Sequence, residues 1–112
     1  MARLAVRAEA EDTLASPGNS EPCYIALSIT TGAGEPVSGL SAADFRVEAI
    51  VLAPGGALVG ISEVSARALP GFYLMRIAPN EPNTWRAGVY IFGLLVETEN
   101  AQGQALAKVS LD

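Results

Sequence analysis

Hydrophobic and polar residues alternate along most of this chain, which is the pattern of β-strands that bury one face. The clearest case is the segment 23–30, where Cys23 and every second residue after it are apolar. Similar segments recur at short intervals, and Gly, Pro and Asn separate them. The pattern predicts strands over residues 3–8, 23–30, 45–52, 58–64, 72–77, 89–96 and 104–111.

The intervals between these strands predict turns and not helices. Pro54-Gly55-Gly56 and Asn100–Gly103 are expected to be hairpin turns, and only Ser41–Asp44 has a helical pattern, about one turn with Ser41 as its cap. An α/β fold needs crossover helices, for which the chain has no room. We therefore expect an all-β chain, a β-sandwich of about seven antiparallel strands. Residues 1–22 would form an opening strand and an acidic loop or linker, and residues 23–112 the sandwich, as a single domain overall.

Four segments, residues 34–45, 71–73, 85–90 and 103–104, resemble parts of bacterial immunoglobulin-like domains of the invasin or macroglobulin kind. Residues 34–45 read GEPVSGLSAADF and are similar to the connection between the second and third strands of such domains. Residues 71–73, 85–90 and 103–104 resemble, in order, the openings of two later strands and the last hairpin. The resemblance implies an immunoglobulin-like sandwich with a noncatalytic role in a bacterial surface, secreted or phage assembly. The chain departs from the antibody pattern, because it lacks paired cysteines and a tryptophan on the third strand.

Size and charge narrow the class of protein. The 112 residues suit one domain, and half of them are hydrophobic. The net charge of −5 argues against nucleic acid or anionic lipid as partner, and no apolar stretch approaches the roughly 20 residues of a membrane helix. The first residues have no uninterrupted apolar core, so we expect no signal peptide. The compartment stays open, although the fold analogy favours the cell surface or the exterior.

Catalysis is not expected. The chain contains no histidine, which excludes the Ser/His/Asp and Cys/His systems and most zinc and iron sites. Cys23, the only cysteine, lies in phase with the buried positions of its strand, and we interpret it as an unreactive core thiol. The glycine-rich segment 31–34 is followed by Glu35-Pro36 and not by a helix, so it is a turn and not a phosphate loop. We therefore predict no enzyme activity, cofactor or metal.

Three of the expected strands carry apolar residues on both faces. If the strands 45–52 and 89–96 are neighbours, as in immunoglobulin topology, their outward apolar residues form one patch. We interpret this patch as an interaction surface for a protein partner or for a second copy, giving a homodimer. The alternative is that the acidic N-terminal stretch, through Leu14, covers it. The predicted surface comprises Ile50, Leu52, Val89, Ile91 and Leu95.

A second hypothesis is a carbohydrate- or calcium-binding accessory domain. Asn83, Trp85 and Arg86 could contact a sugar ring if Trp85 is exposed, and Glu97 and Glu99 could bind a calcium ion. The competing interpretation makes Trp85 a cap on one end of the core, beside Tyr90, whose hydroxyl would bond to nearby backbone as in a tyrosine corner.

Overall fold

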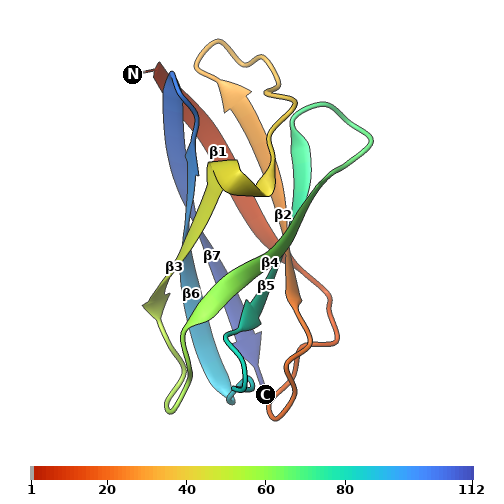
Figure 1. Cartoon of the computed structure of the whole chain (residues 1–112), viewed down its shortest axis with the longest axis vertical. Coiled ribbons are helices and arrows are strands. Elements are labelled where there is room, and N and C mark those ends of the chain that lie inside the picture. Colours follow the sequence, from red (N-terminus) through yellow and green to blue (C-terminus); the bar gives the residue numbers. More distant parts are fainter. Residues whose placement is uncertain (1) are drawn as a thin grey trace.

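The computed structural model describes residues 2–112, and these residues form seven strands and one short 3-10 turn (Figure 1). The strands are β1 (Ala2–Glu11), β2 (Cys23–Thr31), β3 (Phe45–Val51), β4 (Val59–Ala66), β5 (Phe72–Pro79), β6 (Gly88–Glu97) and β7 (Ala101–Leu111). The 3-10 turn, η1 (Ala42–Asp44), is the one helical turn that the sequence predicts. The Asp44 carboxylate accepts a 2.9 Å hydrogen bond from the Ser41 N–H at its start.

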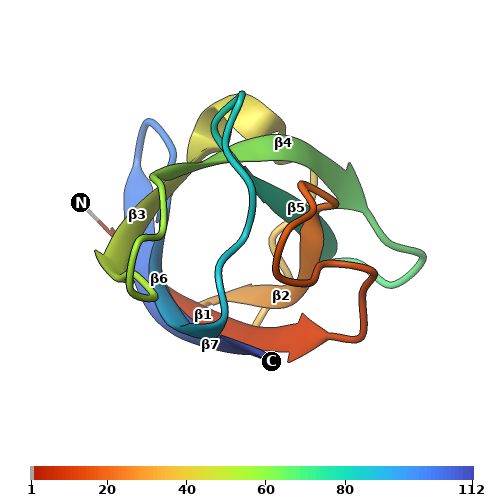
Figure 2. The same ribbon diagram turned by 90° about the horizontal axis from the view of Figure 1, so that it is seen from below.

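The strands form one mixed sheet in the order β3-β6-β7-β1-β2-β5-β4. The sheet curls around a common interior into a half-barrel, as seen from below in Figure 2, and its two edge strands, β3 and β4, do not pair with each other. All-β architecture is confirmed, whereas the expectation of uniformly antiparallel strands is wrong. At its start β1 pairs with β7 in parallel, Ala2 opposite Ala101, and from Leu4 onward it pairs antiparallel with β2. One strand thus joins the two halves of the sheet.

The core fills the concave side of the curled sheet. Along β2, β5 and β6 every second side chain is buried, as period-2 alternation predicts. Aromatic side chains occupy much of this interior: the Phe45 and Tyr73 rings lie 5.7 Å apart, and the Trp85 and Tyr90 rings meet edge to face at 5.0 Å. Within residues 2–112 the core contains no buried polar or charged residue.

The expected hairpin at Pro54-Gly55-Gly56 is wrong. The chain does turn there, with the Gly56 N–H donating to the Ala53 carbonyl oxygen at 2.8 Å, but the flanking strands do not pair. Instead β3 pairs with β6, and β4 pairs with β5. The turn therefore carries the chain from one free edge of the sheet to the other.

Two smaller expectations are also corrected at strand ends. The last hairpin turn lies just before Ala101 and not over residues 100–103, because the Thr98 N–H donates to the Ala101 carbonyl oxygen and β7 begins at Ala101. The opening strand continues to Glu11, paired residue by residue with β2. The loop that follows is therefore shorter than the predicted acidic stretch 9–22.

Candidate interaction surface

The outer face of the β3-β6-β7 half of the sheet exposes several large apolar side chains, among them Ile50, Val89 and Leu106. The registers place its side chains in rows across the three strands. Arg46, Leu95 and Gln104 form one row, and Glu48, Gly93 and Leu106 form the next. We call this surface the outer face. It comprises Arg46, Glu48, Ile50, Val51, Val89, Ile91, Gly93, Leu95, Glu97, Gln102, Gln104, Leu106, Lys108 and Ser110.

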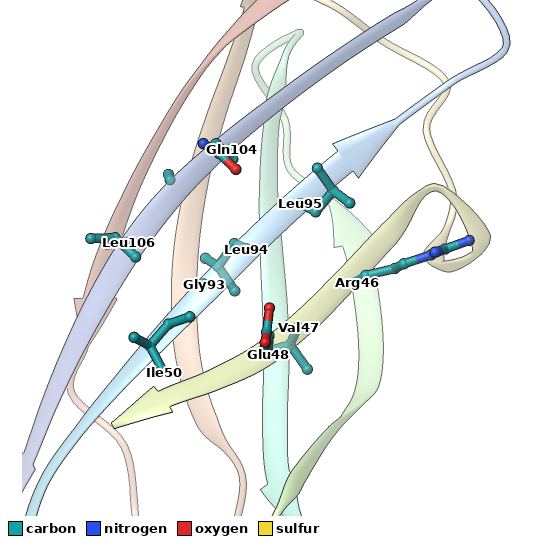
Figure 3. Close-up of a pocket in the computed structure, with 10 residues that line it drawn as sticks. Arg46, Val47, Glu48, Ile50, Gly93, Leu94, Leu95, Gln104 and Leu106 are labelled. Atoms are coloured by element: carbon teal, nitrogen blue, oxygen red, sulfur yellow. The ribbon is translucent and has the colours of Figure 1, made fainter. Parts of the chain in front are cut away.

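A shallow hollow of about 650 Å³ lies at the centre of the outer face (Figure 3). Its floor includes Gly93, and the Ile50 side chain lies against the place that a side chain of Gly93 would take. A Cβ atom added at Gly93 would come within 3.2 Å of the Ile50 Cδ1 atom. Leu106 and Leu95 border the hollow from β7 and β6. Leu106 is 66% exposed and Ile50 is 54% exposed, so this apolar area is in contact with solvent.

The charged side chains of the outer face are two cations, Arg46 and Lys108, and two anions, Glu48 and Glu97. None of the four takes part in a salt bridge within residues 2–112. The opposite outer face, over β1, β2, β5 and β4, differs in this respect. There Arg67 pairs with Glu11 at 3.1 Å, and Arg76 pairs with Glu63 at 3.3 Å. The charges of the outer face are thus available to a partner. On the opposite face these four charges are paired, whereas Arg3, Arg7 and Glu9 of β1 also have no salt bridge within residues 2–112.

Four of the five residues predicted for the surface lie on it: Ile50, Val89, Ile91 and Leu95. Leu52 does not, because it packs against the core. The reason is a bulge in β3, where Ala49 pairs with Phe92 and Val51 with Ile91. The extra residue shifts the alternation by one, so Val51 takes the outward place and Leu52 turns inward.

Sequence reasoning missed Leu106, the most exposed apolar side chain of the outer face. The signal was present, because Leu106 alternates with the buried Ala107 and Val109 and shares its face with Gln104 and Lys108. Because the other outward positions of this strand are polar, a single outward leucine indicates an interaction surface.

The N-terminal stretch does not cover the outer face. Leu14 is 79% exposed, so its side chain covers no apolar patch to any large extent. The loop after β1 is bonded instead to the segment that precedes β6: the Gly18 N–H donates to the Trp85 carbonyl oxygen at 2.9 Å, and the Trp85 N–H donates to Asn19 at 2.8 Å. The alternative interpretation of the apolar patch is therefore wrong.

The residues of the ligand-binding hypothesis do not form one site. Trp85 is fully buried, so its ring cannot stack on a sugar, and it does cap one end of the core beside Tyr90. The Tyr90 hydroxyl accepts a 3.0 Å hydrogen bond from the Arg86 N–H, the short-range contact expected of a tyrosine corner. Asn83 and Arg86 precede β6 and are exposed at one of its ends.

Glu97 and Glu99 lie at the other end of β6. The rise of an extended strand puts this end about 30 Å from the end near Asn83 and Arg86. Both are exposed. Over residues 2–112 no group of three or more acidic, Cys or His side chains is placed to hold a metal ion. Two carboxylates at a solvated strand end give no calcium cage of six or more oxygen ligands.

Cys23 lies in the core, where it is 1% exposed. Burial away from water disfavours the thiolate and raises the pKa of this thiol from 9.0 to about 12. The side chain is therefore a neutral packing group at ordinary pH, as the sequence predicts.

No protein-family model, curated protein or solved structure matches this chain. In the described part of the chain, no helix has the length and apolar character needed to cross a membrane.

Proposed function

We propose that this protein is a noncatalytic immunoglobulin-like module that binds another protein through the outer face of β3, β6 and β7. The observation that carries the proposal is the combination of an open apolar hollow over Gly93 with charged neighbours that have no partner in the chain. Contiguous exposed apolar area with a polar rim is characteristic of protein interaction surfaces.

The strand order supports the immunoglobulin-like assignment. Immunoglobulin domains place their first, second, fifth and fourth strands in one sheet, and their third, sixth and seventh strands in the other. The neighbours β4-β5-β2-β1 and β3-β6-β7 follow the same grouping, with β1 bonded to both groups. On this proposal the curled sheet corresponds to a sandwich whose two layers are joined at β1.

The free edges of the sheet are poor docking sites, so a partner is more readily bound by a face of the sheet. Both edge strands are interrupted by a bulge, between Ala49 and Val51 in β3 and between Ile61 and Glu63 in β4. Bulges break the regular row of backbone donors and acceptors that an added strand would need. A partner would therefore bind to side chains and not extend the sheet.

The path of the chain suits an element of an extended bacterial surface, secreted or phage assembly. Ala2 pairs with Ala101 at the start of β7, and Leu111 lies at the far end of that strand, roughly 33 Å away at the rise of an extended chain. The two chain ends thus lie at opposite ends of the long axis (Figure 1). Modules with this geometry can be joined end to end while their faces stay free.

Site-specific photo-crosslinking tests the proposal. A photoreactive amino acid is placed at position 106 on the outer face, or at position 69 as the matched control. Leu106 and Leu69 are 66% and 64% exposed, so simple accessibility is equal. We expect defined protein adducts, with itself or with another protein of the source cell, from position 106 and not from position 69. Equal or absent adducts at the two positions would contradict a docking role for this face.

A further inference from the structure

We infer that the partner of the outer face is a second copy of this chain, related by a two-fold axis that crosses the strands between the Leu95 row and the Gly93 row. The inference rests on the proposed function and makes it more specific. One such axis makes the facing surfaces of the two copies complementary both in shape and in charge.

Two adjacent rows of β6 are complementary in shape. A two-fold axis between these rows brings each row of one copy over the other row of its mate, because a two-fold interface is reciprocal. Leu95 of one copy then lies over Gly93 of the second copy, and the second Leu95 lies over the first Gly93. A leucine side chain enters each hollow beside the Ile50 side chain, which lies against Gly93 and forms part of the apolar lining. Leu106 of β7 flanks each inserted leucine.

On β3 the same two rows are complementary in charge. Arg46 is in the row of Leu95, and Glu48 is in the row of Gly93. The axis that inserts Leu95 therefore places Arg46 opposite Glu48 of the second copy, and Glu48 opposite the second Arg46. All four of these side chains lack an ion-pair partner within residues 2–112 of their own chain.

The next rows outward agree with this arrangement. Glu97 is one row beyond Leu95, and Lys108 is one row beyond Gly93. The same axis superposes these rows, so that Glu97 lies over Ile91 of the second copy, and Lys108 lies one strand away from the second Glu97. Arg46 and Glu48 thus meet an opposite charge directly, and Lys108 and Glu97 do so diagonally across neighbouring strands. A register displaced by one row would place Glu48 over Glu48, which like-charge repulsion disfavours.

The net charge of the outer face favours self-association there. Its two cations and two anions cancel, whereas the whole chain carries −5. The excess negative charge therefore lies elsewhere, and two copies can meet at the outer face without the repulsion that their net charge would produce at another surface.

The size of the surface predicts a weak dimer. Three strands about 4.8 Å apart and roughly seven residues long give a face of only some 15 by 23 Å. Stable complexes bury roughly 800 Å² on each partner, which is more than this face offers. We expect association in the micromolar to millimolar range, weakened by salt because exposed ion pairs contribute to it.

Sedimentation equilibrium of the purified chain from micromolar to millimolar concentration tests the inference. We expect a reversible dimer in the wild type, and at least tenfold weaker association for Arg46→Glu or Glu48→Arg, since either change opposes like charges. The double variant Arg46→Glu/Glu48→Arg exchanges the charges within one chain, so it restores the reciprocal pairs and the wild-type association. Arg7→Glu is the matched control, because it makes the same charge change at an exposed position of the opposite face.

A monomer at every concentration would overturn the inference, as would a double variant that associates as weakly as the single ones. Equal weakening by Arg7→Glu would assign the effect to net charge and also overturn it. All substituted positions are exposed, and circular dichroism checks that each variant keeps its strands. A monomer that still crosslinks from position 106 to a different protein would leave the proposed function intact, so the two failures are distinguishable.

Discussion

The indole N–H of Trp85 donates a 2.7 Å hydrogen bond to the carbonyl oxygen of Glu21. Together with two backbone hydrogen bonds of Trp85, it fastens the loop after β1 to the entry of β6. The only tryptophan thus lies at one end of the core and also anchors the loop after β1.

This anchor predicts the effect of Trp85→Phe. The variant keeps an aromatic ring but leaves the Glu21 carbonyl oxygen without its donor and leaves space in the core. We expect a loss of about 2–4 kcal/mol in the free energy of unfolding, measured by urea denaturation. Leu14→Ala is the control from the same loop, where a 79% exposed side chain should matter little. Wild-type tryptophan emission should be blue-shifted and resistant to acrylamide; emission at the wavelength of free indole would refute the burial.

A second prediction concerns the loop between β2 and β3. The Tyr73 hydroxyl donates to the Val37 carbonyl oxygen at 2.7 Å and accepts from the Leu40 N–H at 3.3 Å. Tyr73→Phe removes both hydrogen bonds inside the protein, so the free energy of unfolding should fall by about 1–3 kcal/mol. Tyr24→Phe is the matched control, because no hydrogen bond of the Tyr24 hydroxyl occurs within residues 2–112. Equal denaturation midpoints for the two variants would contradict this role of Tyr73.

The positions of the strands could be predicted from the sequence because alternation is a local signal. The segment from Cys23 needs only its own residues to reveal which side is buried. Pairing is different, since it depends on residues far apart in the chain. Pro54-Gly55-Gly56 correctly predicts a turn, but nothing local tells whether the strands on either side bond to each other or to distant ones.

The candidate site could be predicted up to the bulge in β3. Strict alternation that starts with Phe45 as an inward residue identifies the outward residues of β3 correctly as far as Glu48. The extra residue between Ala49 and Val51 then reverses the count, which is why Leu52 was assigned to the wrong side. Neither the bulge nor the hollow at Gly93 has a marker in the sequence, because both depend on which strand lies opposite.

A third prediction concerns the crossing of β1 and β7. A Cβ atom at Gly103 would lie 2.5 Å from the Leu4 carbonyl oxygen, a backbone atom that cannot move without separating the strands. Gly103→Ala should therefore destabilise the protein by about 1–3 kcal/mol, in the range of overpacked interiors. In Gly93→Ala the nearest atom is the flexible end of Ile50, at 3.2 Å, so this control should cost much less. Thermal unfolding of the two variants gives the comparison, and equal shifts in Tm would argue against the crossing as described.

The last prediction is the pH dependence that Cys23 contributes. Its pKa is raised from 9.0 to about 12 by burial, so between these values the unfolded chain loses the thiol proton and the folded chain keeps it. The folded state binds more protons there, and stability must fall as pH rises through this interval, by about 1.4 kcal/mol per pH unit from this group. Below pH 9.0 the contribution is constant.

Other groups also titrate at alkaline pH, so the comparison requires Cys23→Ala. This variant is less stable at neutral pH because it leaves a cavity, but it lacks the thiol and should lose stability less steeply above pH 9.0. Urea denaturation at several alkaline pH values gives the two slopes. Native wild-type protein should also react with a thiol reagent only as fast as it opens, since both burial and the raised pKa suppress the thiolate. Parallel slopes, or rapid labelling of the folded protein, would show that this thiol is accessible to solvent.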